Sequence, residues 1–250
     1  MYFNIIASGS KGNATLIAEG NSLILIDMGI SLARLNEGLA EINKTFDDID
    51  GVIFTHDHSD HISGAKFFPQ NKMYALMGTL PGNNTNVVVL NKQFKIKHLS
   101  ITPFRTSHDA TNPCGFLISG NEETLVYITD TGYVLQETVP LIKNPNYLIL
   151  ESNHDIKMLL NTNRPIELKQ RILSDHGHLC NEDSALAAGS IIGPNTSEVI
   201  LAHLSEEANT SAVAIEAYNQ IFDYLHIDTS KLRIATAKQH ESLKGGRYED

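Results

Sequence analysis

The segment His56-Asp57-His58-Ser59-Asp60-His61 sets the strictest condition on any fold of this chain. It places three imidazoles and the carboxylate of Asp60 within six residues, directly after the apolar run 52–55. In random chains of this composition, the pattern His-x-His-x-Asp-His would occur about once in a thousand sequences. Histidines two positions apart in an extended loop point to the same side, whereas Asp60 and His61 face a second point. The segment therefore predicts ligands for two adjacent metal ions.

Ligands from this loop alone would leave such a site incomplete. Three further polar residues, His108, Asp130 and His203, each follow an apolar run directly. Loops at the ends of strands build sites on a rigid scaffold. We therefore expect the fold to bring these three residues to the cluster at 56–61.

Short apolar runs rich in β-branched residues predict many strands. These runs are 3–7, 14–18, 23–26, 52–55, 87–90, 99–102, 125–129, 147–150, 199–202 and 232–236. Apolar spacing and capping residues, among them Ser31 and Asn181, predict helices at 31–43, 61–68, 165–173, 182–192 and 211–225. The order is not the regular alternation of a doubly wound sheet, and two β-layers flanked by helices fit it better.

We expect one domain over residues 1–250, because the chain shows neither a linker nor an internal repeat, and a frayed tail at 245–250. With 42% hydrophobic residues the chain can bury a core, and its formal net charge of -10 disfavours broad binding to polyanions. Any nucleic acid would therefore need a local positive site. Only two cysteines, the absence of a signal peptide and the absence of a membrane-length apolar run predict a cytoplasmic protein without a membrane partner.

The series His56-x-His58-x-Asp60-His61, His108, Asp130 and His203 resembles the metallo-β-lactamase superfamily, and the resemblance covers nearly the whole chain. Three more stretches, 7–14 (Ala-Ser-Gly-Ser-Lys-Gly-Asn-Ala), 151–155 (Glu-Ser-Asn-His-Asp) and 177–183 (Gly-His-Leu-Cys-Asn-Glu-Asp), are similar to the WalJ/YycJ family of bacterial nucleases. The resemblance implies an α+β fold of the αββα sandwich type, with two mixed β-sheets flanked by helices and a metal site at one edge. It also implies 5′-to-3′ exodeoxyribonuclease activity.

The resemblance also implies a role for each ligand. One metal would be held by His56, His58 and His108, the second by Asp60, His61 and His203, and Asp130 would bridge them. Asp27 resembles an aspartate that orients a ligand imidazole from behind. Such a ligand set suits two divalent ions, Zn²⁺ or Mn²⁺. With their carboxylates and a hydroxide they leave about one positive charge, which suits a phosphate substrate. The hypothesised reaction is in-line attack on phosphorus by a metal-bridging hydroxide.

Further candidates surround these ligands. Asp60 and His178 are the predicted catalytic residues, with His178 as general acid or phosphate clamp, as in related phosphodiesterases. Predicted substrate contacts are Ser10, Asn13, His154 and His176, and the basic residues Arg164, Lys169 and Arg171, which could follow a DNA backbone. A glycine-rich turn, structural histidines and solvated helix charges explain these same residues about equally well.

Several activities remain open on sequence grounds. DNA is the expected substrate, because the chain has no room for a large inserted domain between Asp130 and His203 and no long Gly-Pro-rich arm, both of which mark RNA-processing members of the superfamily. An RNA or cyclic-nucleotide phosphodiesterase is nevertheless an alternative. An acyl hydrolase of the lactonase or thioesterase type is another, since a metal-activated hydroxide also attacks carbonyl carbon. The sequence does not predict the oligomeric state.

Overall fold

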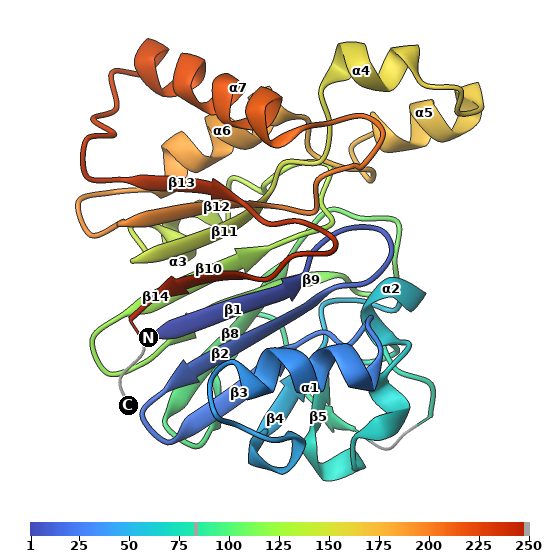
Figure 1. Ribbon diagram of the computed structural model, residues 1–250, viewed down its shortest axis with the longest axis vertical. Helices are drawn as coiled ribbons and strands as arrows, with labels where there is room; N and C mark the ends of the chain where they lie inside the picture. The colour runs from blue at the N-terminus through green and yellow to red at the C-terminus, as the bar shows by residue number, and fades with distance from the viewer. Residues whose placement is uncertain (83–84, 248–250) are drawn as a thin grey trace.

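Two seven-stranded sheets pack face to face in the computed structural model, with helices on their outer surfaces (Figure 1). The structure describes residues 1–82 and 85–247. This arrangement confirms the expected αββα sandwich. Each sheet is mixed, because antiparallel pairing in one half gives way to parallel pairing in the other.

The first sheet contains, in spatial order, β14 (Leu243–Gly246), β1 (Tyr2–Ala7), β2 (Ala14–Glu19), β3 (Ser22–Ile26), β4 (Gly51–Ile53), β5 (Met73–Ala75) and β6 (Asn86–Val87). The second contains β13 (Arg233–Thr236), β12 (Glu198–Ala202), β11 (Tyr147–Glu151), β10 (Thr124–Ile128), β9 (Cys114–Ser119), β8 (Leu99–Arg105) and β7 (Phe94–Ile96).

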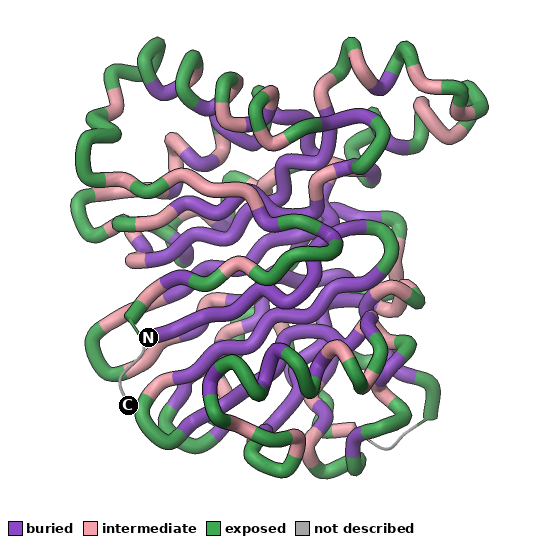
Figure 2. The backbone as a smooth tube through the Cα atoms, viewed as in Figure 1, coloured by how far each residue is buried: buried purple, intermediate pink, exposed green. Residues whose placement is uncertain are grey.

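Apolar side chains fill three layers, one between the sheets and one beneath the helices on each side. Ile24, Phe116 and Ile149 belong to the layer between the sheets. On the outer surfaces, α1 (Leu32–Ala40) covers the first sheet, and α6 (Asn181–Ile191) and α7 (Ser211–Tyr224) cover the second (Figure 1). The central strands are buried on both faces, which explains their continuous apolar runs (Figure 2).

The sequence predictions missed four strands, β5, β7, β9 and β14, and placed one at 87–90 where the structure has only Asn86–Val87. Strand β9 contains Gly115, and a Cβ there would come within 2.7 Å of the Phe104 ring. In β14, Gly245 and Gly246 pair with β1, so these two residues are not frayed as expected. The remainder of that expected tail includes 248–250, which lie outside the described residues.

The predicted helices at 31–43, 165–173, 182–192 and 211–225 correspond to α1, α5 (Ile166–Ile172), α6 and α7. The helix expected at 61–68 is instead α2 (Ser59–Ile62) followed by a separate turn at Ala65–Phe67. Gly64 lies between the two, where a Cβ would come within 2.3 Å of the Met28 side chain. The cap of α6 is Cys180 rather than Asn181, whose side chain accepts a hydrogen bond from Ser152 at 2.7 Å. Short elements complete the chain, namely α3 (Val139–Ile142), α4 (Ile156–Asn161) and the turns Phe46–Asp48 and Gln70–Lys72.

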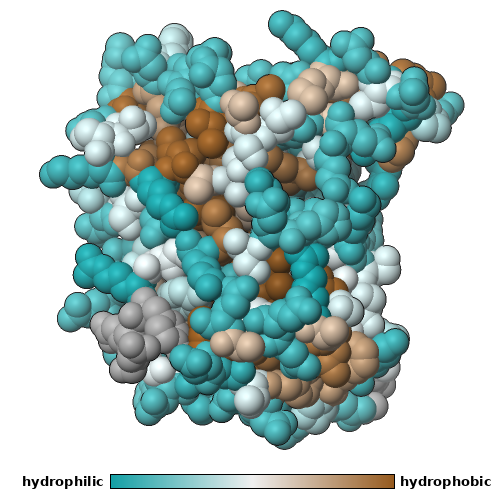
Figure 3. Space-filling model, in the orientation of Figure 1, coloured by the Kyte–Doolittle hydropathy of each residue, from teal (hydrophilic) through white to brown (hydrophobic). Residues whose placement is uncertain are grey.

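The two ends of the sandwich differ. The N-terminus and strand β14 lie at one end, whereas α2, α4 and α5 lie at the other (Figure 1). Hydrophilic side chains cover most of the face seen in Figure 3. Within residues 1–82 and 85–247, no helix combines the length and apolar character needed to cross a bilayer.

Candidate metal centre

The seven expected ligands come together at the end of the sandwich that carries α2. They lie after β4 (His56, His58), in α2 (Asp60, His61), and after β8 (His108), β10 (Asp130) and β12 (His203). Asp130 and His203 have left-handed backbones, with φ of 56° and 55°, as does Asp27 after β3 with 58°. Such conformations are uncommon outside glycine, and they occur here where the chain turns sharply at a strand end.

Potential ligand atoms form overlapping groups. His56, His58 and His108 offer atoms that all lie within 4.8 Å of one another, and so do Asp60, His61 and His203. A third group of this kind joins His56 and His61 to Asp130. The two triads are the same as those expected for the two metals, and Asp130 reaches both, because its Oδ2 lies 3.3 Å from His61 Nε2 and its Oδ1 lies 3.9 Å from His108 Nε2.

The histidine rings are fixed from behind, as metal-binding imidazoles require. His56 Nδ1 lies 3.0 Å from Thr55 Oγ1, and His108 Nδ1 lies 3.1 Å from the Gly177 carbonyl oxygen. The opposite Nε2 atoms of His56 and His203 are buried and make no hydrogen bond to the described residues. Because a buried polar atom normally has a partner, these donors fit a metal ion that supplies one.

Asp27 holds the loop that carries the cluster, as expected. One of its carboxylate oxygens lies 2.8 Å from His61 Nδ1 and accepts a hydrogen bond from the Thr55 hydroxyl at 2.9 Å. The other accepts from the Thr55 backbone N–H at 2.8 Å. The carboxylate thus directs His61 Nε2 towards Asp60 and Asp130.

Glu151 is a residue that the sequence analysis did not single out, although it ends the apolar strand β11. Its side chain is buried, and Oε1 lies 2.9 Å from His203 Nδ1 and 2.7 Å from His178 Nδ1. Oε2 accepts from the backbone N–H groups of Thr131 and Leu179. One carboxylate therefore orients both an expected metal ligand and the expected general acid.

The buried carboxylates give the cluster an environment that favours cations. Burial alone would lower the pKa of His61, but Asp130 and Asp27 outweigh it and hold this pKa well above its usual value. In the same way Asp130 and Glu151 overcome burial and raise the pKa of His203 to about 9. Burial, followed by the neighbouring His61, keeps the pKa of His56 well below its usual value, so that this ring is a neutral donor.

The other expected contact residues lie at different distances from the cluster. Asn13 is buried, and its Nδ2 lies 3.0 Å from His61 Nε2 and 3.4 Å from Asp60 Oδ2. Ser10 is exposed on the same loop. His154 is buried, with neither ring nitrogen hydrogen-bonded to a described residue, and burial lowers its pKa to about 4. His176 is exposed, and its Nδ1 lies 3.1 Å from Ser107 Oγ.

The three basic candidates on or near α5 are engaged with other parts of the chain. Arg164 donates to Glu207 at 2.8 Å, and Lys169 donates to two backbone carbonyls at 2.7 Å. Arg171 pairs with Asp109, whose Oδ1 lies 3.5 Å from His108 Nε2. Contacts within the chain therefore partly neutralise or hydrogen-bond these three basic groups, and their contact with DNA stays a prediction.

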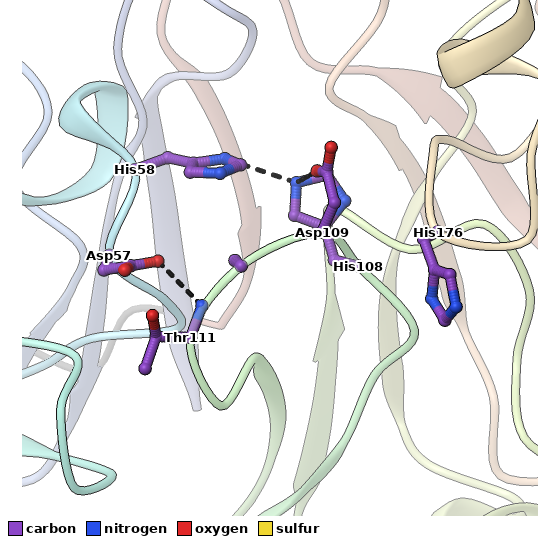
Figure 4. Close-up of a pocket in the computed structure, with 7 residues that line it drawn as sticks. Asp57, His58, His108, Asp109, Thr111 and His176 are labelled. Carbon is purple, nitrogen blue, oxygen red and sulfur yellow. Dashed lines mark hydrogen bonds and ion pairs between the residues drawn. The ribbon is translucent and has the colours of Figure 1, made fainter.

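A cavity of about 380 Å³ opens beside the cluster (Figure 4). It is lined by Asp57, His58, His108, Asp109, Ala110, Thr111 and His176. Figure 4 shows the rings of His58 and His108 facing each other, with 3.3 Å between His58 Nδ1 and His108 Nε2. A molecule in this cavity would contact the triad of His56, His58 and His108 through its last two members.

Residues 23–204 match the family described as the β-lactamase superfamily domain. The chain belongs to the metallo-β-lactamase superfamily. Within the superfamily it belongs to the YycJ/WalJ family, since it is 34% identical to exodeoxyribonuclease YycJ of Bacillus anthracis over 89% of each chain. It is also 33% identical to exodeoxyribonuclease WalJ of Streptococcus pneumoniae over 85% of this chain and 84% of that one. Among solved structures, the metallo-β-lactamase fold protein YhfI of Bacillus subtilis has the same fold, with a TM-score of 0.71 and 18% identity over 98% of this chain and 99% of that one.

Proposed function

We propose that the protein is a metal-dependent phosphodiesterase that degrades DNA as a 5′-to-3′ exonuclease, with two divalent ions, Zn²⁺ or Mn²⁺, in its centre. The observation that carries this proposal is the pair of triads, one of three histidines and one of Asp60, His61 and His203, with Asp130 close to both, on a chain 34% identical to an exodeoxyribonuclease. An RNA, cyclic-nucleotide or acyl substrate has no comparable support. The cytoplasmic location is also a proposal, and it rests on the sequence.

In this proposal His56, His58 and His108 would hold one ion and Asp60, His61 and His203 the other. Asp130, which lies near both groups, would be a further ligand. Bound ions would polarise the phosphate and would lower the pKa of a water molecule bound to them towards neutrality. The Asp60 carboxylate would be held in place by its neighbours, because its Oδ2 lies 3.4 Å from Asn13 Nδ2 and 3.5 Å from His61 Nε2.

The chain itself supplies the proton donor. The His178 side chain is partly exposed, and Glu151 holds its Nδ1 at 2.7 Å. This hydrogen bond leaves Nε2 free to face a substrate. Burial would raise the pKa of Glu151, but His178 and His203 lower it to about 2, so its carboxylate is ionised at neutral pH and can accept a hydrogen bond from the Nδ1–H of His178. His178 can then protonate the leaving oxygen, a step that contributes about 10²–10⁴-fold in rate.

A substrate panel tests the proposal. The protein, loaded in turn with Zn²⁺ and Mn²⁺, is incubated with 5′-phosphorylated duplex DNA, 5′-phosphorylated RNA, a cyclic nucleotide, bis-p-nitrophenyl phosphate, a lactone and a thioester. We expect hydrolysis of DNA from the 5′ end and of bis-p-nitrophenyl phosphate, with metal analysis giving two ions per chain. Turnover of the acyl compounds alone would show that the nuclease assignment is wrong.

A further inference from the structure

A second cavity, of about 370 Å³, adjoins the one at the metal centre. The two share three lining residues, His108, Ala110 and His176. Figure 4 shows His176 on the side of His108 away from His58. The cavities therefore form one groove that begins at the histidine triad and leads away from it past His176.

The far half of this groove combines an aromatic ring with a cation. Tyr133 and Arg105 both line it, together with polar groups such as Asn112. Tyr133 is 45% exposed, so its ring is accessible to a molecule bound in this half of the groove. Arg105 ends β8 and is exposed and, unlike Arg164 and Arg171, makes no ion pair with the described residues.

Tyr133 is held on a rigid support connected to the centre. It follows Asp130 by three positions, and its carbonyl accepts from the Thr131 hydroxyl at 2.7 Å. The Thr131 backbone N–H donates to Glu151, and Gly132 N–H donates to the Ser107 carbonyl at 2.8 Å. These bonds fix the backbone that carries the ring, so stacking on a base would restrict only the side chain of Tyr133 itself.

We propose that this groove carries the DNA strand away from the scissile phosphate, with Tyr133 stacked on a neighbouring base and Arg105 bound to the phosphate beyond it. This assignment of the groove rests on the proposed function, since the groove is the path by which a nucleic acid would leave the centre. Stacking on an aromatic side chain tolerates any base, as an exonuclease requires, and contributes about 5- to 150-fold in affinity. Because the chain has a net charge of -10, binding a DNA phosphate needs a local positive charge, and Arg105 supplies one.

The test of Tyr133 compares the kcat/KM for DNA with that for bis-p-nitrophenyl phosphate, which is too small to extend along the groove. Tyr133→Ala should lower the ratio of the two about tenfold, through KM for DNA, and Tyr133→Phe should restore it. Tyr224→Ala is the matched control, because Tyr224 is 76% exposed at the end of α7 and lines neither cavity of the groove. An abasic nucleotide, moved stepwise along the 5′ end of the substrate, should abolish the effect of Tyr133→Ala at one position.

Arg105 is tested through salt. Arg105→Gln should weaken the dependence of KM on salt by about one unit of slope, and Arg105→Lys should retain it, because a phosphate contact releases about one counterion. If wild-type protein degrades DNA but Tyr133→Ala and Arg105→Gln behave like Tyr224→Ala, the groove assignment is wrong and the proposed function stands. If metal-loaded wild type hydrolyses neither phosphodiester, the proposed function is wrong and the groove assignment fails with it.

Discussion

The carboxylate of Asp27 lies behind the cluster, where it bonds both the backbone and the hydroxyl of Thr55 as well as His61 Nδ1. Replacing Asp27 with Asn keeps the side-chain volume but removes the charge that orients His61. We expect metal affinity to fall about 10- to 100-fold, the usual cost of losing such a partner. Competition with a chromophoric chelator measures this affinity, and circular dichroism checks the fold. An unchanged affinity in a folded variant would contradict the role given to Asp27.

Glu151 acts through its two histidines, so at saturating metal, where weaker binding at His203 is compensated, its loss should resemble the loss of His178. Glu151→Gln should lower kcat on DNA at least tenfold, and the double variant Glu151→Gln/His178→Ala should fall little further than His178→Ala alone, because coupled residues are not additive. His178→Ala should also keep its metal. Hydrolysis of bis-p-nitrophenyl phosphate should suffer less, since p-nitrophenolate leaves without a proton. Strictly additive losses would show that Glu151 does not act through His178.

The buried His154 should make the stability of the protein depend on pH. Burial lowers its pKa from 6.5 to about 4 in the folded protein, so the unfolded chain binds more protons between these values. The contribution of His154 to the free energy of unfolding is therefore fully present above pH 6.5. It falls by about 3 kcal/mol as the pH is lowered towards 4. Urea denaturation of wild type and His154→Leu from pH 7 to pH 4 tests this. Parallel pH profiles for the two proteins would contradict it.

At the scale of secondary-structure elements, the sequence predicted the strands that are continuous apolar runs and missed those that contain glycine or are very short. Gly115 and Gly245 lower the strand propensity of β9 and β14, yet each accommodates a neighbouring ring, of Phe104 and Phe3 respectively. Such packing is tertiary and leaves no local pattern. Glu151 was missed for a related reason, since its partners His178 and His203 lie 27 and 52 positions further along the chain. The clustering of the expected ligands could be predicted because metal ligands are restricted to few residue types, and their role as ligands stays a prediction.

Three loops meet behind the cluster through backbone hydrogen bonds. Asn13 N–H donates to the Asp60 carbonyl, Gly29 N–H to the Asn13 carbonyl, and Met28 N–H to the His61 carbonyl. A Cβ on Gly29 would lie 1.5 Å from the Asp60 carbonyl oxygen, so Gly29→Ala must separate the loops. We expect about 3 kcal/mol of destabilisation, at the upper end for overpacking, together with weakened metal binding.

Gly20→Ala provides the comparison for this variant, because a Cβ at Gly20 meets nothing within 4 Å. Its left-handed backbone, with φ of 53°, alone should cost about 1 kcal/mol. Urea denaturation and metal titration distinguish the two variants. Equal stabilities, or full metal affinity in Gly29→Ala, would show that the junction of the three loops does not position the cluster.

Considered as a whole, the molecule places the expected ligands on both halves of the sandwich. His56, His58, Asp60 and His61 follow a strand of the first sheet, whereas His108, Asp130 and His203 follow strands of the second. The apolar layer between the sheets brings these two sets together at one end. Metal ions that bind both sets would therefore join the two halves and stabilise only the folded arrangement.

Removal of metal should consequently lower the stability of the entire molecule. A ligand present at a thousand times its dissociation constant contributes about 4 kcal/mol, which corresponds to roughly 8–16 °C in Tm for a chain of this size. Calorimetry with and without EDTA measures the shift. Asp130→Ala removes the residue that reaches both triads and should show a much smaller shift, whereas His98→Ala, at an exposed histidine outside the cluster, should show the full one. A shift of the same size in Asp130→Ala would place the stabilising metal elsewhere in the protein, because a cation that joins the two sheets here cannot bind normally without that carboxylate.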